Sequence, residues 1–156
     1  MTVVQWLLLG HLLCAFGFVS AAVVAGVLQW AAIRRDRPSE IAILLQLIRP
    51  AVAVVTLSAV GTLGFGLVLA DQLGVSDSAL WLRAAVALWV LSMILGGVGG
   101  RRARHTRNLA ESLAASGDAP SAELKRALTD PATTTLNTLS FVALVLILVL
   151  MVWQPT

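Results

Sequence analysis

The chain has 156 residues, of which 58% are hydrophobic and only 12% are charged, and its mean hydropathy is +0.89. This composition is far too apolar for a soluble domain of this length and is typical of a membrane protein. The formal net charge is +3, but nearly all the basic residues lie between apolar runs, as membrane topology produces. The basic loop contains no interleaved aromatic residues for stacking on single-stranded nucleic acid, so we expect no nucleic-acid partner.

Four apolar runs predict four membrane-spanning helices, because about 20 apolar residues cross the hydrocarbon core of a bilayer. The second run starts at Ile41, but Arg49–Pro50 divides it, so residues 41–48 are expected to form an approach segment before the span. The remainder has only the length of loops, which predicts a single domain over residues 1–156. The expected spans are residues 3–33, 51–70, 79–100 and 136–153.

The one sizeable polar segment, residues 101–131, lies between the third and fourth spans. Its pattern predicts that the third helix continues to about Ala115 and that a break follows at Gly117–Asp118. A short helix is expected to start near Pro120–Ser121 and to stop before Asp130–Pro131.

The distribution of Lys and Arg predicts the orientation of the chain. The loop after the first span and the segment 101–131 hold nine of the eleven basic residues, whereas the loop 71–78 holds none. The two basic loops are therefore expected in the cytoplasm and both termini outside. The expected fold class is an all-α membrane protein: a four-transmembrane-helix bundle, N-out/C-out, with a cytoplasmic helical loop between helices three and four.

His11 is the clearest candidate for a functional side chain, because an ionisable group within a span costs energy unless it finds a partner. It flanks a stripe of small residues that includes Gly10, Cys14, Gly17 and Ala21, and such stripes mark close helix packing. His11 is therefore expected to face the bundle. There it could donate a hydrogen bond, ligate haem or a metal ion, or serve as a proton relay or substrate contact. Cys14, one turn away, is the residue that could most easily join it as a metal ligand.

Arg83 is the second candidate, early in the third span. It either extends to the outer surface near Asp71 or Asp77, or holds an anion such as a propionate or phosphate. No Asp, Glu or Lys lies within an expected span, which disfavours a carboxylate-driven transporter. The glycine run at 96–100 lacks the Gly-Lys-Ser/Thr signature of a phosphate loop, so it is interpreted as close packing or a hinge.

Several features together carry a family resemblance. They are the basic loop after helix one, the arginine early in helix two, the long basic third loop, the ending at 150–155, and the opening Trp6-x4-His11-Leu12-Leu13-x-Ala15-Phe16. With these features the chain resembles, over essentially its whole length, a family of predicted bacterial integral membrane proteins of unknown function. That family is itself similar to the wider CopD-like group.

The resemblance implies the bacterial inner membrane as the location of this multi-pass protein. Its expected partners are the lipid bilayer and, through the small-residue faces, either a second copy or another membrane protein. The CopD-like group includes copper-resistance membrane proteins and a haem-associated protoporphyrinogen oxidase whose first helix also bears a histidine. Only His11 can be carried over from that group, and it implies haem b or copper as the cofactor.

Two classes of function remain open. The first is a noncatalytic membrane component whose small-residue faces pack against itself or a partner. The second is a haem- or copper-associated redox or transport protein of the CopD-like type. In that second class His11 and Arg83 would bind the cofactor, and His11 and Cys14 would bind a metal ion.

Overall fold

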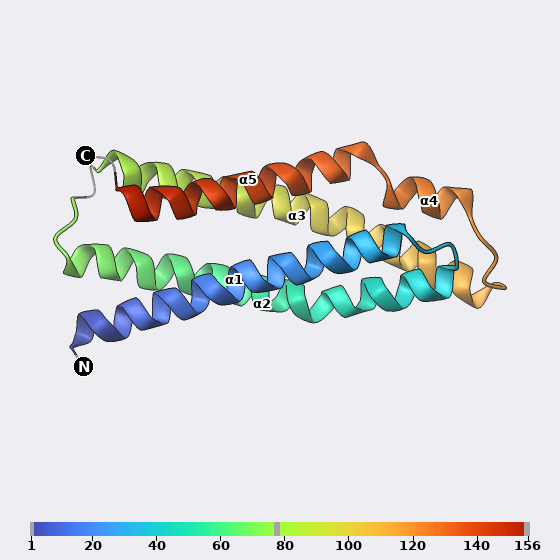
Figure 1. The fold of residues 1–156 in the computed structure, drawn as a ribbon, viewed down its shortest axis with the longest axis horizontal. Coiled ribbons are helices and arrows are strands. Elements are labelled where there is room, and N and C mark those ends of the chain that lie inside the picture. The colour runs from blue at the N-terminus through green and yellow to red at the C-terminus, as the bar shows by residue number, and fades with distance from the viewer. Residues whose placement is uncertain (1, 77–78, 155–156) are drawn as a thin grey trace. The chain divides into compact units, whose positions relative to one another are not determined.

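The computed structural model describes residues 2–76 and 79–154. Within these residues the secondary structure is entirely helical, and Figure 1 shows the helices in chain order. They are α1 (Val3–Ile33), α2 (Pro38–Gln72), α3 (Leu80–Ala115), α4 (Ala122–Leu128) and α5 (Pro131–Trp153). In the described part of the chain, four helices are long and apolar enough to cross a membrane, the fourth being α5 together with α4. The predicted class, a membrane protein with four long apolar helices, is confirmed.

The two longest helices extend far beyond what a bilayer requires. At a rise of 1.5 Å per residue, the 35 residues of α2 and the 36 residues of α3 extend for about 50 Å each. The hydrocarbon core is about 30 Å thick, so each helix has about 20 Å of length outside it. In α3 this extra length is the polar continuation to Ala115, which the sequence predicted.

Contrary to expectation, Arg49–Pro50 does not divide the helix of the second apolar run. Pro50 lies inside α2, which is one helix from Pro38 to Gln72, and the start of the membrane span at residue 51 stays a prediction. A proline removes one backbone hydrogen bond, yet membrane helices tolerate this loss because neighbouring groups satisfy the freed carbonyl. Pro38 gives the helix its start, since proline fits the first helical position, and Glu40 places a negative charge in the first turn.

The connection between α3 and α5 follows the prediction closely. The chain leaves α3 through Gly117 and Asp118, whose φ angles are 129° and 57°. Glycine adopts this left-handed region without steric cost, and aspartate tolerates it better than most residues. Ser121 then caps α4 by accepting a hydrogen bond from the backbone N–H of Leu124.

Helix α5 begins at Pro131, five residues before the expected fourth span. Its N-cap is Asp130, whose Oδ2 accepts hydrogen bonds from the backbone N–H of Thr133 at 3.1 Å and from its hydroxyl at 2.8 Å. Asp130 caps the helix and Pro131 takes the first helical position. Asp130–Pro131, which was expected to end the helix before it, therefore also starts α5.

The chain divides into two compact units, and each is described by itself. The first unit is Met1–Trp30 with Gln46–Ser76, which is most of α1 and α2. The second unit is Ala31–Leu45 with Asp77–Thr156, which holds the turn between α1 and α2 together with α3, α4 and α5.

In the second unit, α3 and α5 pack along each other. Their contact includes a hydrogen bond at 3.3 Å from the Ser140 hydroxyl of α5 to the Ser92 carbonyl of α3. Gly99 lets α5 approach at a further point, because a Cβ atom added there would lie 3.1 Å from Oδ1 of Asn137. In this unit, polar side chains of α5 thus lie in the contact with α3.

Candidate functional site

The predicted stripe of small residues on α1 is a contact surface with α2 in the first unit. A Cβ atom added at Gly17 would lie 2.6 Å from Oγ of Ser58, and one added at Gly10 would lie 3.1 Å from the Phe65 ring. Ala21, the next small residue along the stripe, is buried. Because the two helices approach where side chains are absent, the packing prediction is confirmed.

Cys14 belongs to the same contact. Its sulfur fills the space over Gly61, where an added Cβ atom would lie 2.5 Å from Sγ. The thiol is free and half-buried. The sulfur of Cys14 thus has a packing partner on α2, whereas its predicted role as a metal ligand stays a prediction. Within residues 2–76 and 79–154, no cluster of three or more His, Cys, Asp or Glu residues is arranged to hold a metal ion.

His11 forms the polar part of the contact. Its Nδ1 lies 2.9 Å from the backbone carbonyl oxygen of Thr62 in the adjacent helix α2. A Cβ atom added at Gly66 would lie 3.0 Å from both Nδ1 and Cε1 of the ring, so this glycine provides the room that the imidazole occupies. As predicted, His11 faces a neighbouring helix.

This hydrogen bond determines which nitrogen carries the proton. A carbonyl oxygen can only accept, so Nδ1 is the donor, and in the neutral ring the lone pair resides on Nε2. Among the described residues Nε2 of His11 has no hydrogen-bond partner. His11 therefore joins the two helices through Nδ1, and the lone pair of Nε2 is free to accept a hydrogen bond or to bind a metal ion.

Arg83 is an exposed residue of α3 in the second unit, whereas His11 and Cys14 belong to the first. Of the two acidic residues considered as its neighbours, Asp71 is exposed at the end of α2, and Asp77 lies outside the described residues. Both interpretations of Arg83, a surface-directed side chain and an anion ligand, stay predictions.

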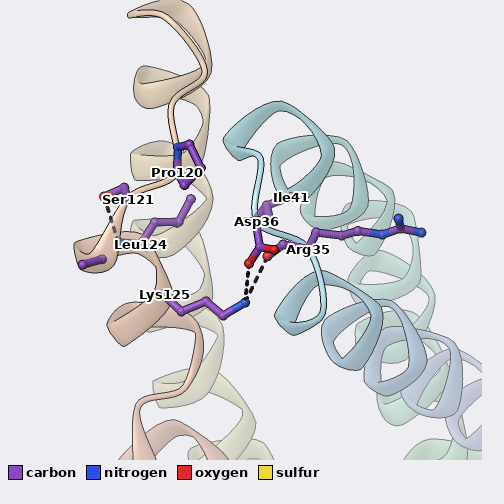
Figure 2. Close-up of a pocket in the computed structure, with 8 residues that line it drawn as sticks. Arg35, Asp36, Ile41, Pro120, Ser121, Leu124 and Lys125 are labelled. Carbon is purple, nitrogen blue, oxygen red and sulfur yellow. Dashed lines mark hydrogen bonds and ion pairs between the residues drawn. The ribbon is translucent and has the colours of Figure 1, made fainter.

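Sequence reasoning missed a polar site in the second unit, where α4 meets the turn between α1 and α2. Nζ of Lys125 donates to the carbonyl oxygens of Ile33 at 2.9 Å and Arg35 at 3.2 Å, and it pairs with Asp36 at 3.0 Å. Figure 2 shows the Lys125 side chain directed at Arg35 and Asp36. The last carbonyls of a helix have no partner inside it and carry partial negative charge, so the lysine caps the end of α1.

The start of α2 receives a matching cap from the loop before α4. Asp118 accepts two hydrogen bonds of 2.7 Å from Ser39, one from its backbone N–H and one from its hydroxyl. The hydrogen bonds from the hydroxyl and the N–H of Ser39, with the charge of Arg37, hold the pKa of Asp118 below its ordinary value of 3.8 despite some desolvation. An acid therefore caps the positive end of α2, and a base caps the negative end of α1.

A small cavity of about 230 Å³ accompanies these caps. Arg35, Ile41, Pro120, Ser121 and Lys125 are among its lining residues (Figure 2). The polar groups in its walls are already ion-paired or cap a helix. They do not form a set of free polar groups that converge on a ligand. We therefore describe it as a consequence of how α4 sits on the turn.

No family model, curated protein or solved structure matches this chain. By the length and composition of its four long helices, the protein belongs to the class of helical multi-pass membrane proteins. Its candidate site is the α1–α2 contact around His11.

Proposed function

We propose that the protein is a noncatalytic, multi-pass component of the bacterial inner membrane, and that it works by packing against a second copy or a partner membrane protein. One observation carries this proposal. His11, the ionisable residue in the first span, uses Nδ1 to join α1 to α2 through the Thr62 carbonyl. That bond supports a structural role for the histidine.

The size of this role can be bounded. Hydrogen bonds between membrane helices contribute roughly 1 kcal/mol or less, because the unfolded chain in the membrane also finds partners. His11 should therefore contribute modestly to stability, and the small residues beside it should contribute more.

The test compares His11→Asn with His11→Leu in detergent-purified protein. An asparagine amide can place an N–H close to the position of Nδ1, whereas leucine fills the volume and donates nothing. We expect the thermal midpoint of the Asn variant to stay near that of the wild type and the Leu variant to unfold a few degrees lower. The control is Leu12→Ala, at the exposed position directly after His11, and it should change the thermal midpoint little. A Leu variant as stable as the wild type would contradict the structural role.

A second function is favoured by a specific observation at the same residue. Histidines that ligate metals commonly donate their other ring N–H to a backbone carbonyl, which orients the ring and leaves one lone pair for the ligand. His11 has this arrangement, with Nε2 as the free nitrogen. The resemblance to the CopD-like group favours the same idea, with His11 as the ligand of haem b or copper.

The residues present fit one ligand position. Nε2 of His11 would hold the iron or copper, and haem or copper would supply one-electron transfer. Cys14 has its sulfur packed over Gly61, so a further haem ligand would come from a weak donor, water or a second chain.

Purification from haem- and copper-replete cells distinguishes the two functions. The noncatalytic proposal expects no Soret band and no copper by elemental analysis in the wild type. The second function expects a Soret band or bound copper that both His11→Asn and His11→Leu abolish, although the Asn variant keeps its thermal stability. A Soret band that both variants retain would show that His11 is not the haem ligand.

The N-out/C-out orientation is part of the proposal and rests on the nine basic residues of the two loops. Single cysteines at Ser76 and Ser116, in a Cys14→Ala background, should differ in labelling by an impermeant reagent added to intact cells. We expect labelling of Ser76→Cys alone. Labelling of Ser116→Cys alone would reverse the orientation.

A further inference from the structure

Within the second unit, the polar continuation of α3 has one exposed face. Gly99, Thr106 and Ala110 are buried and mark the packed face of this segment. Arg101 and Arg104 are exposed, and at 100° per residue they project from the opposite side of the helix. We call this surface the Arg101–Arg104 face.

The four arginines of the segment differ according to their position on the helix. Arg102 and Arg107 flank the packed face and are ion-paired, with Asp130 at 2.7 Å and Glu111 at 3.6 Å. For Arg101 and Arg104 the described residues provide no ion pair and no hydrogen bond. The protein thus neutralises two of these charges internally and leaves two uncompensated on one face.

The place of these two charges along α3 is informative. From Ala84 to Gly100 the helix carries no charged residue, so Arg101 is the first charge after the apolar stretch. It therefore lies where the hydrocarbon core gives way to the lipid headgroups.

The glycine run before Arg101, which was interpreted as close packing or a hinge, is closely packed at one position only. Only Gly99 packs against another helix, whereas a Cβ atom added at Gly96, Gly97 or Gly100 would meet nothing within 4 Å. Side chains of a helix lean towards its N-terminus, so Arg101 extends over the turn that contains Gly97. Gly96, Gly97 and Gly100 leave open space in this stretch, where Val98 is an exposed side chain.

We propose that the Arg101–Arg104 face binds the headgroup of an anionic glycerophospholipid. A guanidinium group can donate two parallel hydrogen bonds to a phosphate, and it carries its charge at every physiological pH. From Arg101 to Asn108 this face holds His105 and no carboxylate, and Glu111, three residues further on, is ion-paired with Arg107 at 3.6 Å. Each basic residue near an anionic membrane surface strengthens lipid association by about fivefold.

The experiment uses the whole protein in mixed micelles with equal amounts of phosphatidylglycerol and phosphatidylcholine. Native mass spectrometry of retained lipid gives the relative association constant of the two lipids. The wild type should prefer phosphatidylglycerol, and the double variant Arg101→Gln/Arg104→Gln should lower this preference by roughly 25-fold, which is about fivefold for each charge. Raising the salt concentration should weaken the preference of the wild type, because screening shortens electrostatic interactions.

The matched control is Arg102→Gln/Arg107→Gln, which removes the same charge from the same helix but at the ion-paired positions. It should retain most of the preference for phosphatidylglycerol, and Arg126→Gln, at an exposed position of α4, serves the same purpose with one charge. Thermal unfolding in phosphatidylcholine alone should be the same for the wild type and for Arg101→Gln/Arg104→Gln.

Two results would overturn the proposal. An equal loss of preference in the test and the control variants would show an effect of net charge alone. If the wild type shows no preference for phosphatidylglycerol, the two arginines bind something other than an anionic lipid, such as an acidic protein segment.

Discussion

The two units use different interactions to join their helices. In the first unit, α1 and α2 meet through glycine, alanine and cysteine, with the His11–Thr62 hydrogen bond as the polar part. In the second unit, the ends of α1 and α2 are held by Lys125 and Asp118 through charged hydrogen bonds. Lipid offers no hydrophobic drive between helices, so close backbone approach is effective there, whereas helix ends in water gain from opposite charges.

The largest effect should come from filling the α1–α2 contact. Gly17→Leu should lower the free energy of unfolding by roughly 3 kcal/mol, because its side chain would need the space of Ser58. Gly26→Leu is a matched control on the same helix, since an added Cβ there meets nothing within 4 Å. Denaturation in detergent measures both variants. Equal destabilisation would show that small residues do not govern this contact.

A smaller effect should come from the Cys14–Gly61 pair. Gly61→Ala should lower the thermal midpoint, because the new methyl group would overlap Sγ of Cys14. Cys14→Ala removes this sulfur, so the double variant Cys14→Ala/Gly61→Ala should recover most of the loss. The coupling should be about 1 kcal/mol in a double-mutant cycle. Additive effects would mean that the two residues do not share this space.

In the second unit, removing one cap should cost about as much as the Cys14–Gly61 coupling. Lys125→Met keeps an apolar stem and leaves the Ile33 and Arg35 carbonyls without the lysine donor, which should cost about 1 kcal/mol. Limited proteolysis at Arg34 or Arg35 should become faster, since the turn loses its attachment to α4. Arg126→Met, on the neighbouring exposed position, should leave the cleavage rate unchanged.

The smallest effect concerns pH. Asp118 has a pKa below 3.8 in the folded protein, so its contribution to stability is present above about pH 4. The contribution is lost as the pH falls through the lower, folded value, because protonation removes the acceptor of the Ser39 hydrogen bonds. Asp118→Asn should therefore show a shallower decline of thermal midpoint between pH 5 and about pH 3 than the wild type. Parallel declines would assign the acid sensitivity to other groups, with Asp130 as the next candidate, since its pKa is also lowered, mainly by the Thr133 hydroxyl.

Most of the helices could be predicted from the sequence because their causes are local. The apolar runs, the break at Gly117–Asp118 and the cap signal at Ser121 each depend on a few neighbouring residues. The expected division of the second apolar run at Pro50 was wrong for the same reason. A proline is a strong local signal for a break, but whether a long apolar helix continues through it depends on the surrounding structure.

The sequence by itself determined that four long apolar helices form and that the small-residue stripe of α1 would be a contact, since periodicity encodes both. Only the tertiary structure decided the partner of each polar group. His11 binds a backbone carbonyl, which every residue of α2 possesses, so no pattern could identify Thr62. Asp118 and Lys125 act on helix ends 79 and 92 residues away in the chain, and such pairings follow from how the chain folds back rather than from any local spacing.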